Sequence, residues 1–265
     1  MTAQQTSIYR TSAIRFAFQS LALAVAAIPF SGCATSNVSE TPSVARSDSM
    51  PPVSPKEAMD RLLVGNQRFV SNQDNGTQRD PSRRAELAKG QHPFAIVLAC
   101  SDSRVPPELV FDQELGDIFV IRVAGNTADD VALGSIEYAV EHLGAKLVVV
   151  LGHERCGAVS AAVKGGELPG HLPKVVADIL PLVAASKAHP GDPVHNCVWH
   201  NAATVAARIR ESGPILNEFV ERGDIVVVSA VYDLDTGIVR FLPKTQEGSR
   251  AGRVADAAGV RFIGP

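Results

Sequence analysis

The amino-acid sequence predicts an α/β fold: a mostly parallel central β-sheet with flanking helices and an antiparallel edge strand. Two observations predict it. Short, continuously apolar runs have the length and composition of strands that are buried on both faces of a sheet. Helical stretches alternate with these runs, as they do when helices connect parallel strands. The 265 residues suffice for one sizeable α/β domain or, at most, two small ones.

The folded body is expected to begin with a helix at residue 54. Ser54 precedes a proline at the first helical position, and Glu57 lies three residues after the serine, which together form a capping box. A second short helix is expected over residues 82–89, because Gly90 follows as a stop signal.

The remaining elements follow in alternation. The expected strands are residues 94–99, 117–123, 146–151, 224–231 and 238–242. The expected helices between them are residues 128–143, 158–163, 173–188 and about 195–222. A tight turn at residues 235–237 joins the last two strands, so the final strand is expected to be antiparallel at an edge of the sheet.

The first 32 residues are expected to be an export signal. Arg10 and Arg15 precede an apolar run of about ten residues, roughly half the length of a membrane-spanning helix. Residues 30–33 resemble the cleavage site of a bacterial lipoprotein, in which Cys33 would become the lipidated first residue. The alternative is an ordinary secretory signal cut near Ala34. The mature protein is therefore expected in the periplasm or anchored to the outer membrane by lipid alone.

Composition divides the rest of the chain into three segments. Residues 33–53 are rich in Ser, Thr, Pro and Ala and are expected to form a flexible linker. Residues 54–245 are expected to fold as the main domain, and residues 246–265 are expected to be a Gly- and Ala-rich tail. The formal net charge of −3, without a cluster of basic and aromatic residues, gives no reason to expect nucleic acid as a partner.

Metal-ligating side chains follow two of the expected strands. One strand runs directly into Cys100, and another is followed by His153 and Cys156. Ligands bind beyond the carboxyl ends of strands in such sheets, so these three residues are expected to meet. Two thiolates and one imidazole are a known ligand set of catalytic zinc. We therefore expect one zinc ion here; the alternative for the two cysteines is a disulfide.

Asp102 and Arg104 follow Cys100 at spacings of two and four residues. The carboxylate could complete a four-coordinate zinc site, or it could pair with the guanidinium and leave the fourth position to water. Zinc lowers the pKa of water from 15.7 to about 7 and so provides a nucleophile at neutral pH. Asp102, held ionised by Arg104, could then orient the attacking oxygen toward a small carbonyl-like carbon.

Four segments together resemble the β-class carbonic anhydrases, over about residues 55 to 243. They are residues 100–105 (Cys-Ser-Asp-Ser-Arg-Val), 124–126 (Ala-Gly-Asn), 152–157 (Gly-His-Glu-Arg-Cys-Gly) and 230–237. The resemblance implies that the two cysteines and the histidine bind zinc. It also implies that the aspartate and arginine form a catalytic dyad, and that the reaction is the reversible hydration of CO₂ to bicarbonate and a proton.

The resemblance also assigns pocket residues. Gln91, Phe119 and Tyr138 match the substrate-binding residues of the plant-like type of this family. The other type carries a Trp three residues before the first zinc cysteine, where this sequence has Val97. We therefore expect the open type, in which Asp102 binds zinc only in a closed state.

The resemblance further implies a homodimer, or a tetramer of paired dimers, with N-terminal helices clasping the partner and the pocket at the interface. Arg122, after the second strand, is expected to be a structural ion-pair partner. Two alternative functions remain at this point: hydrolysis of CS₂ or COS at the same zinc site, and zinc binding without catalysis.

Overall fold

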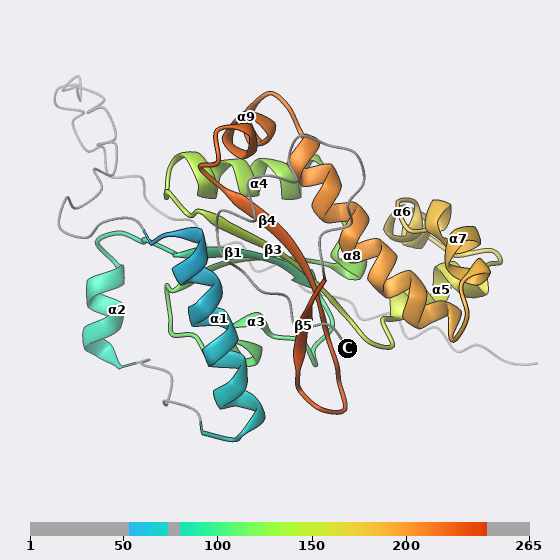
Figure 1. Ribbon diagram of the computed structural model, residues 1–265, viewed down its shortest axis with the longest axis horizontal. Coiled ribbons are helices and arrows are strands. Elements are labelled where there is room, and N and C mark those ends of the chain that lie inside the picture. Colours follow the sequence, from blue (N-terminus) through green and yellow to red (C-terminus); the bar gives the residue numbers. More distant parts are fainter. Residues whose placement is uncertain (1–52, 74–79, 243–265) are drawn as a thin grey trace, which may run out of the picture. The chain divides into compact units, whose positions relative to one another are not determined.

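A five-stranded sheet forms the centre of the protein (Figure 1). The computed structural model describes residues 53–73 and 80–242. The strand order is β2-β1-β3-β4-β5, in which the first four strands are parallel and β5 is antiparallel to β4. The strands are β1 (Ala95–Cys100), β2 (Ile118–Val123), β3 (Leu147–His153), β4 (Val226–Tyr232) and β5 (Val239–Phe241). The predicted fold class is therefore confirmed.

Helices cover both faces of this sheet (Figure 1). They are α1 (Pro55–Val70), α2 (Pro81–Leu87), α3 (Pro107–Val110), α4 (Asp130–Glu141), α5 (Gly157–Lys164), α6 (Leu172–Val176), α7 (Val183–Ala188), α8 (Pro193–Glu211) and α9 (Ile215–Glu221), with short 3₁₀ turns η1 (Ala124–Asn126) and η2 (Leu180–Leu182). Helices α4, α5, α8 and α9 pack on one face, and α1 and α3 pack on the other.

Alternate strand residues supply the two layers of the core. In β1, Ile96, Leu98 and Cys100 belong to the layer under α4 and α8, whereas Ala95 and Val97 belong to the layer under α1. All residues of β1 are buried. A strand that is covered on both faces has no solvent side to make polar, which explains the continuous apolar runs in the sequence.

The predicted strands agree with the observed ones to within two residues at each end. Half of the predicted capping box is present: the backbone N–H of Glu57 donates to Ser54 Oγ at 3.2 Å, whereas the Glu57 carboxylate accepts from Arg61 at 2.6 Å. The second predicted helix corresponds to α2, which begins after Asp80.

Two predicted helices are wrong in their extent. The helix predicted over 195–222 is two helices, because Pro214 lacks the N–H that would continue α8 into α9. The helix predicted over 173–188 is split into α6, η2 and α7, and Pro181 lies in the 3₁₀ turn between the two helices. Helix α3 was not predicted, since its four residues are too few to show a helical period.

The side-chain amide of Asn66, in α1, is buried and makes hydrogen bonds to the backbone of neighbouring elements. Asn66 is only 6% exposed. Its Nδ2 donates to the carbonyls of Val110 and Gly237, both at 2.9 Å, and its Oδ1 accepts from the N–H of Val239 at 2.9 Å. The amide thus connects α1 with α3 and with β5.

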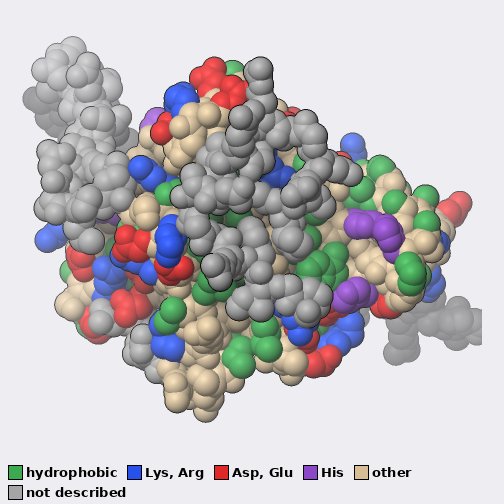
Figure 2. Space-filling view, in the orientation of Figure 1, with side chains coloured by type: hydrophobic (Ala, Val, Ile, Leu, Met, Phe, Trp, Pro, Cys, Tyr) green, Lys and Arg blue, Asp and Glu red, His purple; other side chains and the backbone are tan. Residues whose placement is uncertain are grey.

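Several predicted segments lie outside the described residues: the leader over 1–32, Cys33, the linker up to residue 52, and the tail over 246–265. Among the described helices, none combines the length and apolar character that a bilayer span requires. On the face shown in Figure 2, Lys and Arg side chains are interspersed with Asp and Glu, and histidines gather over the region of α6 to α8.

Candidate metal centre

The carboxyl ends of β1 and β3 carry the three predicted metal ligands. Cys100 is the last residue of β1, and His153 is the last residue of β3. The two strands are parallel neighbours, so their ends lie side by side. Cys156 caps the N-terminus of α5, three residues after His153. The structure therefore brings together residues that are far apart in the sequence.

The ligand atoms of these residues form one compact buried cluster. The Sγ atoms of Cys100 and Cys156 are 4.0 Å apart, and both sulfurs lie within 4.8 Å of a nitrogen of His153. A tetrahedral zinc with bonds of about 2.3 Å to sulfur separates two sulfurs by about 3.8 Å. The spacing in this site thus fits a zinc ion without rearrangement of the backbone.

His153 presents one ring nitrogen to the cluster. Its Nδ1 lies 2.9 Å from the carbonyl oxygen of Glu154, to which it donates in the tautomer that leaves Nε2 unprotonated. The side chain is fully buried, and Nε2 has no hydrogen-bond partner. A buried polar atom without a partner is costly unless something binds it. A metal ion could take this position, because the two sulfurs and this nitrogen are together a known donor set for zinc.

The contact between the two thiols shifts their pKa values in opposite directions. A hydrogen bond from Cys156 lowers the pKa of the Cys100 thiol to about 4, against the opposing effect of burial. The same contact, together with burial, raises the pKa of Cys156. Backbone N–H groups also point at the sulfurs: Gly125 donates to Cys100 Sγ at 3.3 Å. Cys100 is therefore prepared as a thiolate ligand.

The disulfide alternative does not describe this structure. Cys100, Cys156 and Cys197 are all free and buried. Cys197 is a residue of α8 that is buried in the core, outside the cluster.

Asp102 is held beside the cluster by Arg104. The guanidinium donates from Nε to Oδ1 at 2.9 Å and from Nη2 to Oδ2 at 2.7 Å. The backbone N–H of Arg104 adds a third bond to Oδ1 at 2.9 Å. Arg104 accordingly holds the pKa of the Asp102 carboxyl well below its usual range. The nearest approach of this carboxylate to His153 Nε2 is 3.9 Å. Both oxygens of the Asp102 carboxylate are thus bound by Arg104.

The loop between His153 and Cys156 is held at two points. Nδ1 of His195, in α8, lies 3.0 Å from a carboxylate oxygen of Glu154, and Arg155 forms a two-pronged ion pair with Asp235 at 2.7 and 2.8 Å. Arg155 has a φ of 52°, a left-handed conformation that is unfavourable for a residue with a Cβ. This bend at Arg155 turns the chain between the two ligands.

Arg122 contacts the Cys100 loop and Asn201 contacts the neighbouring turn at Gly125, and sequence reasoning missed the role of both. Arg122 donates from Nε to the carbonyl of Cys100 at 3.0 Å and from Nη2 to the carbonyl of Asp102 at 2.5 Å. The expectation of an ion-pair role for Arg122 is wrong, because its partners are backbone carbonyls. Asn201 of α8 donates to the carbonyl of Gly125 at 2.8 Å. No motif in the sequence marks Asn201, because only the fold brings α8 to this loop.

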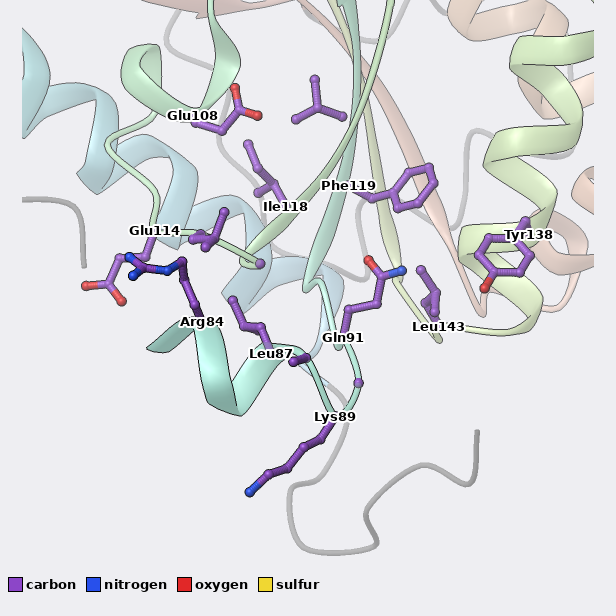
Figure 3. Close-up of a pocket in the computed structure, with 15 residues that line it drawn as sticks. Arg84, Leu87, Lys89, Gln91, Glu108, Glu114, Ile118, Phe119, Tyr138 and Leu143 are labelled. Carbon is purple, nitrogen blue, oxygen red and sulfur yellow. The ribbon is translucent and has the colours of Figure 1, made fainter. Parts of the chain in front are cut away.

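The predicted substrate-binding residues lie in a different place on the same chain. Gln91, Phe119 and Tyr138 line a pocket of about 810 Å³ that includes none of the three metal ligands and neither member of the Asp–Arg pair. In Figure 3 they gather around Leu143 at one end of it. Phe119 pairs with Ile96 near the start of β1, whereas the metal ligand is the last residue of that strand. One chain alone therefore does not bring these two groups together.

Comparison with known proteins gives a consistent family. Residues 95–239 match the family model described as "Carbonic anhydrase". The chain is 38% identical over 192 residues to carbonic anhydrase 2 of Mycobacterium tuberculosis, covering 71% of this chain and 93% of the relative. It is 33% identical over 191 residues to a carbonic anhydrase of Pseudomonas aeruginosa, covering 67% and 85%. Among solved structures, the β-carbonic anhydrase CcaA has a TM-score of 0.57 and 30% identity, covering 70% of this chain and 95% of that one.

Proposed function

This chain belongs to the carbonic anhydrase family, in its β class, and we propose that it hydrates CO₂ reversibly with one zinc ion held by Cys100, His153 and Cys156. One observation carries the zinc assignment. Three soft or borderline ligand atoms converge in a buried cluster, and the Nε2 atom of His153 is left without a partner. Zinc would make water a nucleophile at neutral pH when bound there.

In the proposed mechanism, Asp102 acts as a hydrogen-bond acceptor and orienting group. Its carboxylate stays ionised because Arg104 binds both oxygens. An ionised carboxylate can only accept hydrogen bonds, so it fixes the direction in which an attacking O–H group points its free lone pair. Arg104 holds this carboxylate in a two-pronged pair, so Asp102 would not act as a fourth ligand of a zinc ion held by Cys100, His153 and Cys156.

The proposal is tested by stopped-flow CO₂ hydration on zinc-loaded protein. Cys156→Ser should lose zinc, and Asp102→Asn should keep zinc while kcat/KM falls by at least about 100-fold, a typical effect of removing an acid–base or orienting group. Asp178→Asn is a matched control, because Asp178 also pairs with an arginine, Arg208, at 3.0 Å on the surface. Its activity should remain that of the wild type.

The outcomes separate the rival functions. Zinc-independent activity, or none in the zinc-loaded wild type, would refute the proposal. Turnover of CS₂ or COS without turnover of CO₂ would favour the related hydrolase, and stoichiometric zinc binding without either activity would favour a zinc-binding protein.

We further propose that Gln91, Phe119 and Tyr138 complete the metal site of a second copy of the chain. The edge strand β2 supports such an interface, because its sequence is mostly apolar while only Ile118 in it is buried within the chain. Tyr138 is 47% exposed, although its ring forms a tilted pair with the ring of Phe119, with the two centroids 6.4 Å apart. These are surfaces that association would cover.

Mixed dimers test this arrangement directly. Asp102→Asn and Gln91→Ala are each expected to be impaired as homodimers. If Gln91 acts across the interface, the mixed dimer contains one site with both defects and one intact site, so co-expression restores activity. If Gln91 acts within its own chain, both sites of the mixed dimer are defective and activity stays low. A monomer in solution would also refute the proposal.

The export and lipid anchor remain part of the proposal, on the evidence of residues 1–33 alone. Cells that produce the full chain should contain it in the membrane fraction, and globomycin should block its processing. Cys33→Ala should release the protein from that fraction. A mature protein that begins near Ala34 and is soluble in the periplasm would show an ordinary secretory signal instead.

A further inference from the structure

Arg122 lies beside the metal site but is neither a metal ligand nor a member of the Asp–Arg pair. It is the fifth residue of β2, half-buried at the edge of the sheet. Its Nε and Nη2 atoms donate to the carbonyls of Cys100 and Asp102 at 3.0 and 2.5 Å. One guanidinium thus holds the backbone of a metal ligand and the backbone of the catalytic carboxylate at once.

We propose that Arg122 is a positioning residue that fixes Asp102 relative to the metal by clamping the peptide segment from Cys100 to Asp102. The inference rests on the proposed zinc site and on the role proposed for Asp102. It adds a residue that acts on the reaction through the backbone, without touching the substrate.

The geometry at the end of β1 explains why a clamp is needed there. The backbone ladder between β1 and β2 ends where the N–H of Ser101 donates to the carbonyl of Val123 at 3.2 Å. Beyond that bond the chain has left the sheet, yet Asp102 must be held accurately. The Arg122 side chain adds two hydrogen bonds, to the carbonyls of Cys100 and Asp102. These bonds keep the backbone attached to β2 as far as Asp102.

Arginine is the side chain that suits this task. Its planar guanidinium has N–H donors at fixed angles and can hold two acceptors in one geometry, whereas lysine has a single compact donor centre. No carboxylate lies within ion-pair distance of Arg122 in the described part of the chain. The hydrogen bonds of its guanidinium are those to the backbone carbonyls of Cys100 and Asp102.

A purely structural role is the rival explanation, and the chain offers a matched control for it. Arg210 of α8 is also a partly buried arginine that donates to a strand carbonyl, that of Val227, at 3.2 Å. Val227 lies near the start of β4, away from the carboxyl end that carries the metal ligands. Loss of Arg210 should therefore cost stability without disturbing the site.

The experiment compares Arg122→Met and Arg210→Met with the wild type in four measurements. They are thermal unfolding, zinc affinity by chelator competition, the visible and near-ultraviolet spectrum after cobalt(II) loading, and kcat and KM for CO₂ hydration. For Arg122→Met we expect zinc affinity and kcat to fall by about 10- to 100-fold, the range for groups that orient metal ligands. KM should stay within about twofold, since positioning acts on the transition state.

The cobalt spectrum should change in Arg122→Met and not in Arg210→Met, because only the former moves a thiolate ligand. Arg122→Lys retains the charge and one donor group, so its losses in zinc affinity and kcat should be smaller. If Arg122→Met does not fold, the same measurements on Arg122→Lys replace it. Wild-type kcat, zinc affinity and cobalt spectrum in the folded Arg122 variant would overturn the inference while leaving the proposed function intact. A wild-type protein that binds no zinc would instead refute the proposed function and the inference with it.

Discussion

Asp102 and Arg104 are joined by two nearly parallel hydrogen bonds, at 2.9 Å between Nε and Oδ1 and at 2.7 Å between Nη2 and Oδ2. Both carboxylate oxygens are occupied in this way, so the carboxylate cannot turn toward the cluster without breaking the pair. The side chain of Arg104 is about half exposed, whereas that of Asp102 is 17% exposed. A solvent-facing arginine thus controls a mostly buried carboxylate.

Arg104→Gln should therefore convert the open site toward the closed one. Without the guanidinium, the pKa of Asp102 rises back toward its usual value, but the group stays ionised at pH 7 and is free to bind the metal. We expect kcat/KM for CO₂ hydration to fall by about 100-fold or more while zinc content is unchanged. A crystal structure of the zinc-loaded variant should place Asp102 on the metal. Wild-type turnover in this variant would show that the pair does not keep the position open.

Zinc binding should release about one proton at pH 6, where a zinc-bound water, with a pKa of about 7, still keeps both of its protons. The Cys100 thiol, with a pKa of about 4, is already a thiolate at that pH, whereas the raised pKa of Cys156 keeps the second thiol protonated. Metal binding requires both thiolates, so the proton of Cys156 must leave, and affinity should rise with pH. Titration calorimetry in buffers of different ionisation enthalpy measures the released protons. A value near zero would mean that both cysteines are ionised before zinc arrives.

The strands and the ligand cluster could be predicted from the sequence for one physical reason. A strand that is buried on both faces is continuously apolar, so the first polar residues after it mark the strand end. Cys100 and His153 fall at such ends, and neighbouring parallel strands bring their ends together. The site was therefore encoded locally, in two short segments.

Residues that hold the cluster in place could not be predicted in the same way. Arg122 and Asn201 act through backbone carbonyls, which leave no trace in the spacing of side chains. The break between α8 and α9 was missed because the apolar period continues across it, although Pro214 was a visible stop signal. The pocket of Gln91 was predicted by resemblance, but its separation from the metal within one chain depends on topology alone.

Gly65 and Gly134 should respond in opposite ways to substitution by alanine. A Cβ at Gly65 would lie 1.8 Å from the carbonyl oxygen of Phe111, so Gly65→Ala must push α1 away from α3. We expect a loss of more than about 4 kcal/mol in the free energy of unfolding. Nothing lies within 4 Å of a Cβ at Gly134, in α4, so Gly134→Ala should gain about 0.5–1 kcal/mol through helix propensity. Urea unfolding of both variants checks the pair.

Asn66 should be a major contributor to the attachment of α1. Its amide makes three hydrogen bonds of 2.9 Å to the backbone, and Asn66→Ala leaves all three backbone groups without this partner. We expect a loss of about 2–4 kcal/mol in urea unfolding. Asn66→Asp keeps the acceptor for Val239 but loses both donors, so it should also be destabilised. Equal stability of Asn66→Asp and wild type would contradict the assigned bonds.

Asn201 should tune the thiolate of Cys100 through the peptide of Gly125. Asn201 is 1% exposed and donates to the Gly125 carbonyl at 2.8 Å, while the N–H of Gly125 donates to Cys100 Sγ at 3.3 Å. In Asn201→Leu the backbone at Gly125 loses the anchor at its carbonyl, so its N–H is held less firmly against Cys100 Sγ; a weaker N–H···S bond makes the sulfur a stronger electron donor. We expect the thiolate-to-cobalt charge-transfer band of cobalt-loaded protein to move to lower energy, with a loss of about 1–3 kcal/mol in stability.

Val205→Ala provides the control for that stability loss. Val205 is also buried in α8, one helical turn after Asn201, but its apolar side chain makes no hydrogen bond to the Gly125 carbonyl. Its truncation should lower the free energy of unfolding by a similar amount, because it leaves a cavity. The cobalt band of Val205→Ala should stay at the wild-type position. If both variants shift the band equally, the effect follows from general loosening of α8, and the path from Asn201 through Gly125 to Cys100 is refuted.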